Sequence, residues 1–374
     1  MASHFGQKLL HKIGVDLDLP GSTTTTPTSQ HNSPPERAVI DHEHERILGE
    51  RGTYPRLARL SDGSILAAMT RRENGLRVLS ISKSIDNAGS FSAFAEVTRG
   101  PGDVDNLFLL EIRPGHVLAA FRNHDLDPHG RPTYFRITVC QSTDGGRSWM
   151  FLSQAAEKRA PLGLWEPFMR LGRGGEVQMT FSQEFAPDDQ RTMLVVSRDQ
   201  GRSWSAPVCV EGAQERLRDG MTGIAVTRDA SSGREALVMV FETTRYRTFN
   251  VEAVVSYDDG ATWQHRHEVY VPPRGHNAGA PQIASFADGS LAAVFMTDED
   301  ADRVEWVKHA AIKVVFAGPP QDGRIRWGAP LVVCEKASVW PGVMALDDDT
   351  VMVTYDCRGP RAKTITWRRH RHDL

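Results

Sequence analysis

Two glutamates follow or interrupt apolar segments, in a setting that suits acid–base and covalent chemistry. Glu166 lies within the segment GLWEPF, and Glu242 directly follows a β-rich apolar run. An apolar environment raises the pKa of a carboxyl group, as a general acid requires, and a second carboxylate nearby can act as a nucleophile. Glycoside hydrolysis uses such a pair. In the alternative interpretation, each glutamate only pairs with a backbone group or with an arginine such as Arg245 or Arg247.

A turn motif that recurs along the chain predicts the scaffold for these carboxyl groups. The Asp-box pattern, Ser-x-Asp-x-Gly-x-(Ser/Thr)-Trp, occurs at residues 142–149, 197–204 and 256–263, with an altered copy at 84–91. We expect its aspartate to accept N–H groups of its own turn, and its tryptophan to fill the gap between neighbouring sheets. The motif therefore indicates a fold and carries no chemistry itself.

A second repeat consists of a turn followed by a β-rich apolar run. It occurs at residues 60–69, 112–121, 171–181, 231–241, 286–295 and 346–355. Six such hairpins predict an all-β fold, a six-bladed β-propeller of the Asp-box kind with four short strands per blade. A strand from about Ala38 to Leu48 is expected to complete the last blade and close the ring, which removes exposed sheet edges.

Alignment of the hairpins places polar residues at one rim of the propeller. In an antiparallel hairpin, the start of the first strand and the end of the second lie at the same end of the sheet. The first strands start at residues 54–56, 105–106, 166–167, 219–221, 277–281 and 340–341. The second strands end at residues 70–71, 122–123, 182–184, 242, 296–300 and 356–358. Glu166 and Glu242 are thus expected at one rim, on the adjacent blades 3 and 4, and His276 is expected at the same rim.

The chain is expected to divide into a tail and a domain. Residues 21–36 are rich in Thr, Ser and Pro and predict a disordered linker, so residues 1–37 are expected to form a flexible N-terminal tail. Residues 38–374 are expected to form the propeller. The first residues lack the apolar run of a secretory signal, and no stretch has the length of a membrane span. We therefore expect an intracellular or non-classically exported protein.

Composition argues against several classes of partner and cofactor. The net charge of -3 and the pI near 6.5 give no electrostatic reason to expect a nucleic acid or an anionic membrane as partner. The four cysteines are widely spaced, which favours reduced, mostly buried thiols over a metal site, and no cofactor is expected. The acidic run 298–300 would suit a cation, although an acidic surface loop is the alternative.

At these residues the chain resembles glycoside hydrolase family 93, the exo-α-1,5-L-arabinanases, within the wider sialidase-like propeller superfamily. The matching segments are YPRLARLSDGSILA (54–67), GLWEPFMR (163–170), RDGMTGIAV (218–226), VFET (240–243), NAGAPQI (277–283), FMTDED (295–300) and SVWPGVMALD (338–347). The resemblance implies a retaining, exo-acting enzyme that releases arabinobiose from the non-reducing end of linear α-1,5-L-arabinan. It implies that Glu166 is the acid/base and Glu242 the nucleophile, with carboxyl groups about 5–5.5 Å apart.

The rim position predicts that Arg56, Asn277, Trp340 and Tyr355 line the substrate pocket. The expected partner is an arabinan-like oligosaccharide or polysaccharide, and a monomer is expected.

Two other functions stay open from the sequence. An exo-sialidase needs three arginines for the sugar carboxylate, and Arg56, Arg122 and Arg358 are among those available, with Tyr355 as a nucleophile. However, in YPR the arginine follows the proline, whereas in sialidases it precedes an Ile-Pro pair. The other alternative is a noncatalytic propeller that binds a glycan or a protein, and the two intact carboxylates count against it.

Overall fold

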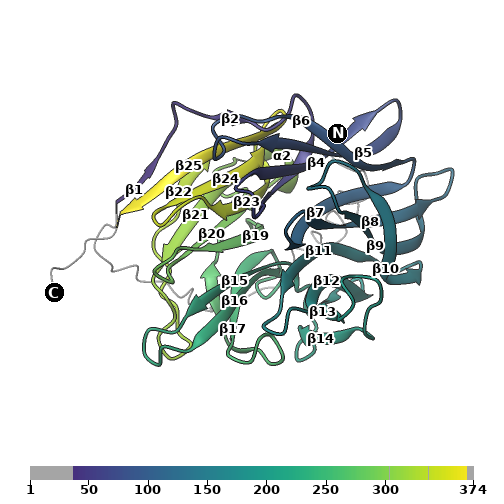
Figure 1. Ribbon diagram of the computed structural model, residues 1–374. Helices are drawn as coiled ribbons and strands as arrows, with labels where there is room; N and C mark the ends of the chain where they lie inside the picture. Colours follow the sequence, from purple (N-terminus) through teal and green to yellow (C-terminus); the bar gives the residue numbers. More distant parts are fainter. Residues whose placement is uncertain (1–36, 303, 336, 369–374) are drawn as a thin grey trace.

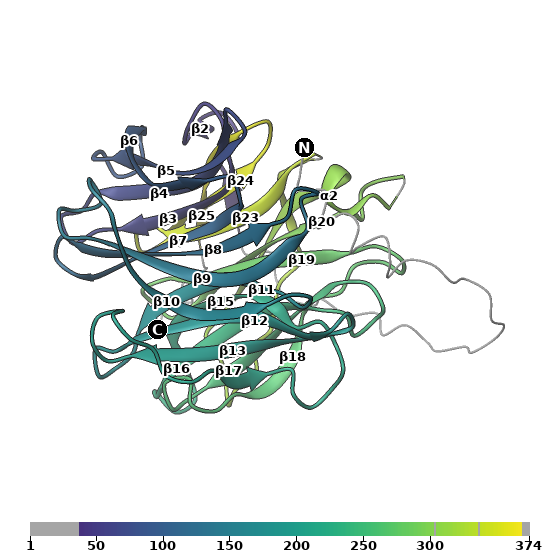
Figure 2. The same ribbon diagram turned by 90° about the vertical axis from the view of Figure 1, so that its right-hand side faces the viewer.

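The computed structural model describes residues 37–302, 304–335 and 337–368, which form six antiparallel sheets around a common axis (Figure 1). The first strands of neighbouring sheets contact one another, so these strands surround the axis. The predicted six-bladed propeller is confirmed. Figure 2 shows the same sheets after a rotation of 90° about the vertical axis. The linker expected at residues 21–36 lies outside the described residues.

Blades 1 to 5 each consist of four consecutive strands, counted outward from the axis. Blade 1 contains β3 (Thr53–Arg59), β4 (Ile65–Glu73), β5 (Leu76–Ser84) and β6 (Ser92–Gly100). Blade 2 contains β7 (Asp103–Arg113), β8 (His116–Leu126), β9 (Pro132–Ser142) and β10 (Met150–Arg159). Blade 3 contains β11 (Leu164–Leu171), β12 (Val177–Ala186), β13 (Asp189–Ser197) and β14 (Val208–Glu211). Blade 4 contains β15 (Gly220–Arg228), β16 (Glu235–Thr243), β17 (Asn250–Ser256) and β18 (Gln264–Tyr270). Blade 5 contains β19 (Ala278–Ser285), β20 (Leu291–Thr297), β21 (Ala311–Ala317) and β22 (Leu331–Cys334).

The sixth blade joins the two ends of the described chain. It contains β23 (Val339–Ala345), β24 (Thr350–Asp356) and β25 (Pro360–Arg368), and its outer strands are β1 (Arg37–Ile40) and β2 (Arg46–Ile47). Ala38 pairs with Trp367, and Arg46 pairs with Ala362. The predicted closing strand is confirmed, although it consists of two short pieces and starts at Arg37.

A short helix, α2 (Trp306–His309), lies between β20 and β21. Within the described part of the chain, no helix is long and apolar enough to cross a membrane.

The Asp boxes form the local contacts that the sequence predicts. In the blade 2 copy, Asp144 Oδ1 accepts the Ser148 N–H at 2.9 Å, and Gly146 N–H donates to Ser142 Oγ at 2.8 Å. Trp149 packs into the apolar cluster between blades 1 and 2. The motif therefore fixes both the turn and the spacing of adjacent blades.

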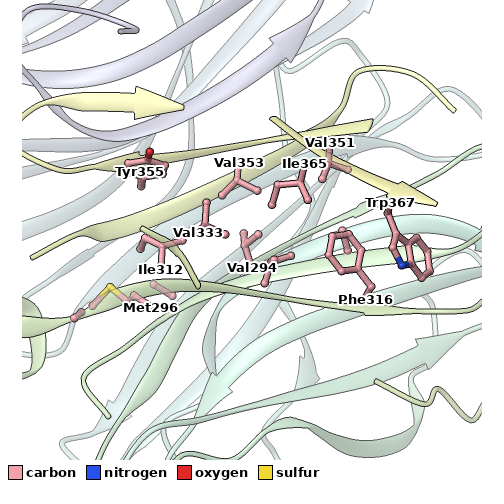
Figure 3. Packing of buried hydrophobic residues seen from close by; sticks show 14 of the residues in the cluster. Val294, Met296, Ile312, Phe316, Val333, Val351, Val353, Tyr355, Ile365 and Trp367 are labelled. Carbon is pink, nitrogen blue, oxygen red and sulfur yellow. The ribbon is translucent and has the colours of Figure 1, made fainter. Parts of the chain in front are cut away.

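The apolar core lies between the blades. One such cluster lies between blades 5 and 6, where alternate residues of β20 and β21 face those of β24 and β25 (Figure 3). Phe316 and Trp367 stack in this cluster, with ring centroids 5.0 Å apart. All four cysteines are free; Cys140 is buried and the other three are half-buried.

Each first strand carries a β-bulge with a positive-φ residue, and this irregularity repeats in all six blades. These residues are Tyr54, Asn106, Glu166, Met221, Ala280 and Trp340, with φ between +35° and +58°. Side-chain-bearing residues adopt this conformation at a cost, and strained backbone of this kind is concentrated at functional sites. Bulges also redirect side chains out of the regular alternation of a strand. The repeated bulge therefore marks one level of the propeller as special.

The second strand of each blade has an equivalent position of its own. It is the residue that pairs with the first strand just before the bulge. These residues are Thr70, Arg122, Ser182, Glu242, Met296 and Asp356. Equivalent residues on equivalent strands face the same way, here toward the next blade. Arg122 accordingly reaches Glu166 of blade 3, and Glu242 reaches the backbone of blade 5.

Candidate active site

The structure brings Glu166 and Glu242 together from adjacent blades. Glu166 is the positive-φ residue of the β11 bulge, and Glu242 pairs with Gly220 near the end of β16. The side chain of Glu166 is 15% exposed, and Glu242 is 8% exposed. The two carboxyl groups are close enough that the charge of Glu242 raises the pKa of Glu166. Both sequence-predicted carboxyl groups therefore share one buried site.

Burial gives both carboxyl groups unusually high pKa values. It is the main cause that raises the pKa of Glu166 to about 8; the nearby charge of Glu242 adds to the rise, and Arg122 and Arg218 oppose it. Burial also raises the pKa of Glu242 to about 7, against a hydrogen bond from Ala280 and the charge of Arg218. A carboxyl group with such a pKa can hold a proton near neutral pH and release it during a reaction.

Arg122 lies beside Glu166 and is already shared among carboxylates. Its Nη1 is 3.9 Å from Glu166 Oε1, while Nη2 is 3.2 Å from Asp103 Oδ1 and 3.3 Å from Asp105 Oδ2. Its guanidinium lies 5.5 Å from the centre of the Trp165 ring. Because Asp103 and Asp105 also pair with Arg122, the charge of Arg122 offsets only part of the rise in the pKa of Glu166.

A chain of hydrogen bonds connects the strands that carry the two glutamates. Gly163, just before β11, donates its N–H to Glu184 Oε2 at 2.9 Å, and Glu184 Oε1 accepts Arg218 Nη2 at 2.8 Å. The N–H of Arg218 in turn donates to Thr244 Oγ1 at 3.0 Å, just after β16. Arg218 and Glu184 are both buried. This buried bridge holds blades 3 and 4 in register at the level of the site.

The backbone of β19 contacts the Glu242 carboxylate directly. The N–H of Ala280 donates to Glu242 Oε2 at 2.7 Å. A Cβ on Gly279 would lie 2.5 Å from the same oxygen and 3.2 Å from Cζ2 of Trp306. A side chain at this position would therefore displace the carboxylate from its hydrogen bond with Ala280. The contact also shows that the edge of the Trp306 indole lies close to Glu242.

Arg56 and Trp340 lie together beside the same site. Arg56 donates through Nη1 to the carbonyl oxygens of Pro55 at 2.9 Å and Trp340 at 3.3 Å, and its guanidinium lies 3.9 Å from the centre of the Tyr54 ring. It is buried, and its Nη2 has no hydrogen-bond partner among the described residues. The charge of Glu166 acts on Arg56, although burial remains the main cause that lowers its pKa. The Nη2 nitrogen of Arg56 is itself buried within the protein.

Asn277 lies next to the site, but its side chain is engaged within the protein. Its Oδ1 accepts the N–H of Phe249 at 3.1 Å, and its Nδ2 is 3.4 Å from Asp298 Oδ2. Asp298 Oδ1 also accepts the N–H of Asn277 at 2.7 Å. Asn277 thus fixes the start of β19, the strand that contacts Glu242.

Tyr355 is buried in the core and does not line the site, contrary to the prediction from the sequence. It is fully buried in the cluster between blades 5 and 6, and its hydroxyl donates to Glu45 at 2.5 Å. Figure 3 shows it in one row with the valines of β24. The residue of blade 6 that is equivalent to Glu242 is Asp356, and side chains alternate between faces along a strand. Tyr355 therefore faces blade 5 and has no exposed surface for a sugar.

The acidic run 298–300 is paired within the protein. Asp298 is bound by Asn277, and Glu299 is bound by Lys313 and by the hydroxyl of Tyr270 at 2.5 Å. His276 lies beside it, with Nδ1 3.1 Å from the Asp298 carbonyl oxygen. Among the residues that the structure describes, no group of three or more His, Cys, Asp or Glu could hold a metal ion.

Three further residues belong to the site and were not singled out as site residues from the sequence. Asn106 is the residue of blade 2 that is equivalent to Glu166, and its buried Oδ1 lacks a described partner. Arg218 bridges the two blades that carry Glu166 and Glu242, and Trp306 approaches Glu242. A signal for the bulges was present, because proline follows four of the six positive-φ residues and cannot donate a ladder hydrogen bond. The sequence offered no comparable signal for Trp306.

The fold is similar to that of solved glycoside hydrolases. The chain is similar to the Penicillium chrysogenum α-L-arabinanase complexed with arabinobiose, at 15% identity and a TM-score of 0.60 over 88% of this chain and 98% of that one. It is similar to the GH93 α-L-arabinofuranosidase of Fusarium graminearum with arabinobiose, at 16% identity and a TM-score of 0.61 over 88% and 98%. It is also similar to the NanB sialidase of Streptococcus pneumoniae, at 12% identity and a TM-score of 0.56 over 89% and 70%.

A scan of protein-family models and a search of curated proteins find no match. The structural similarity confirms the sialidase-like propeller fold that the sequence resemblance implies.

Proposed function

We propose that the protein is a retaining glycoside hydrolase that releases arabinobiose from the non-reducing end of linear α-1,5-L-arabinan. The observation that carries the proposal is the pair of buried carboxyl groups, Glu166 and Glu242, with raised and unequal pKa values. The arabinobiose complexes of the similar α-L-arabinanase and α-L-arabinofuranosidase support the substrate class.

The environments of the two carboxyl groups support a division of roles. Glu166 has the higher pKa, about 8, which suits the group that must donate a proton. Glu242 has a pKa of about 7, and the hydrogen bond from Ala280 stabilises its ionised form. We therefore assign Glu166 as the acid/base and Glu242 as the nucleophile.

The reaction then follows the two-step course of retaining glycosidases. Glu166 protonates the glycosidic oxygen while Glu242 attacks the anomeric carbon, so the leaving chain departs with the proton. Glu166, now ionised, removes a proton from a water molecule. That water attacks the anomeric carbon, which releases the sugar and restores Glu242 as a carboxylate.

The arginines at the rim support a neutral substrate over a sialoside. Arg122 is shared by Asp103 and Asp105, and Arg245 is bound by Glu252 at 2.7 Å and by Glu215. A substrate carboxylate would have to compete with these pairs. A neutral sugar needs no arginine triad.

The substrate class is tested by a direct comparison of two substrates. Incubation with debranched arabinan is expected to release reducing sugar, whereas a sialyl-lactose of either linkage is expected to stay intact. Turnover of the sialoside without turnover of arabinan would contradict the proposal and favour a sialidase.

The raised pKa values predict a neutral pH optimum. Glu242 must be ionised to attack, so kcat/KM is expected to fall as the pH drops below about 7. Glu166 must be protonated to donate, so kcat/KM is expected to fall as the pH rises above about 8. The measurement is a pH profile of kcat/KM, which reports the ionisations of the free enzyme. An optimum below pH 5 would show that neither carboxyl group has the raised pKa.

A further inference from the structure

The connection between β20 and β21 is much longer than its counterparts in the other blades, and it carries α2. It spans residues 298–310, whereas the equivalent connections span residues 74–75, 127–131, 187–188, 244–249 and 357–359. All of these connections lie at the rim where the second strands end, which is the rim of Glu242. Blade 5 therefore adds material to the wall of the candidate site that the other blades lack.

Trp306 is the part of this connection that reaches the site. The hypothetical Cβ of Gly279 would lie 3.2 Å from Trp306 Cζ2 and 2.5 Å from Glu242 Oε2, so the indole edge and the carboxylate flank the same small space. Glycine at this position leaves the space open. The edge of the indole thus lies beside this oxygen of Glu242.

The orientation of the indole is fixed, although the ring is only partly buried. Trp306 stacks on the buried Phe249, with ring centroids 6.1 Å apart and planes 21° apart. It packs against the apolar cluster that also contains Tyr54 and contacts Trp340. None of the residues of α2 is fully buried. A half-exposed, oriented aromatic ring has area to offer to a ligand at little cost in conformational entropy.

We propose that Trp306 forms an aromatic platform for the sugar residue bound next to Glu242, and that it thereby sets a preference for neutral sugars with an apolar C–H face. This inference rests on the proposed function of the Glu166 and Glu242 pair. Each face of an arabinofuranose ring carries ring C–H groups, and such a face packs on an indole. A charged substituent on that face would lose hydration without gaining a partner, because the ring offers only apolar surface.

The test separates binding from turnover. Equilibrium binding of arabinobiose is measured by calorimetry. The parent protein for this test is the Glu242→Gln variant, in which hydrolysis is prevented. Adding Trp306→Ala is expected to weaken binding about 10-fold or more, whereas Trp306→Phe, which keeps an aromatic face, is expected to retain most of the affinity. Val304→Ala, at an exposed apolar side chain of the same connection, is the matched control and is expected to bind as the parent does.

The outcomes distinguish the platform from the proposed function. Unchanged affinity in Trp306→Ala, with the thermal unfolding midpoint of the parent, would overturn the platform. An equal loss in Trp306→Ala and Trp306→Phe would also overturn it, because it would indicate a packing role. Wild-type protein that leaves arabinan intact, while the parent binds a neutral disaccharide such as arabinobiose or xylobiose through Trp306, would overturn only the function. A parent that binds neither disaccharide would overturn both.

Discussion

Replacing Glu242 by glutamine is expected to lower kcat on linear arabinan by about 10⁴-fold or more, on the scale seen when other hydrolases lose their nucleophile. The substitution keeps the size of the side chain and removes the attacking oxygen anion. In the wild-type structure, the N–H of Ala280 donates to Glu242 Oε2 at 2.7 Å. The amide oxygen of a glutamine can accept the same hydrogen bond, so the fold is expected to stay intact. Steady-state kinetics and the thermal unfolding midpoint are the measurements.

The matched control for this variant lies on the same strand. Glu235 is at the opposite end of β16, where its half-exposed side chain pairs with Arg173 at 2.7 Å. Glu235→Gln is expected to keep wild-type activity, because an exposed ion pair contributes little. Activity within a few-fold of wild type in Glu242→Gln would discard the nucleophile assignment.

Replacing Glu166 by glutamine is expected to lower kcat on arabinan by about 10²–10⁴-fold, the range of general acid catalysis. The loss should depend on the leaving group, since only a poor leaving group needs the proton. A dinitrophenyl α-L-arabinobioside leaves without protonation, so the first step on this substrate is expected to be nearly normal in Glu166→Gln. The variant should then show a burst of phenol followed by slow turnover, because the base for the second step is missing.

The same variant removes the alkaline limb of the pH profile. Wild-type kcat/KM on arabinan is expected to fall above pH 8, where Glu166 loses its proton. With the dinitrophenyl substrate, Glu166→Gln should keep a flat profile there and retain the acid limb that belongs to Glu242. An equal loss on both substrates, with no burst, would contradict the acid/base role of Glu166.

The fold could be predicted from the sequence because its signals are local and repeated. Each Asp box and each turn-plus-strand segment depends on contacts within one hairpin, and six copies define six blades. The ring closure followed from the same logic, since a final blade with a missing strand leaves an exposed edge. The structure shows β1 and β2 on β25 as this argument requires.

The level of the site along the blades was also predictable, but the direction of individual side chains was not. The hairpin alignment placed Tyr355 and Glu242 at similar heights, yet side chains alternate along a strand. Glu242 is equivalent to Asp356, so Tyr355, one residue earlier, faces the neighbouring blade and is buried. A one-residue shift in a pairwise alignment is enough to exchange a pocket residue for a core residue.

Contacts between distant segments could not be inferred from these repeats. Arg218 joins Glu184 and Thr244 through pairings that only the packing of blades 3 and 4 defines. Trp306 approaches Glu242 from an irregular connection without a repeat equivalent. Neither residue has a sequence neighbour that indicates its role, so both had to be found from their three-dimensional surroundings.

We propose that Glu166 and Glu242 together carry out retaining hydrolysis of linear arabinan. The most direct test follows the wild-type reaction on a linear α-1,5-L-arabino-oligosaccharide by time-resolved proton NMR. Retention predicts that the first product to appear is arabinobiose with the α configuration at its new reducing end, before mutarotation. A first product with the β configuration would contradict it, as would the absence of cleavage by protein that is folded.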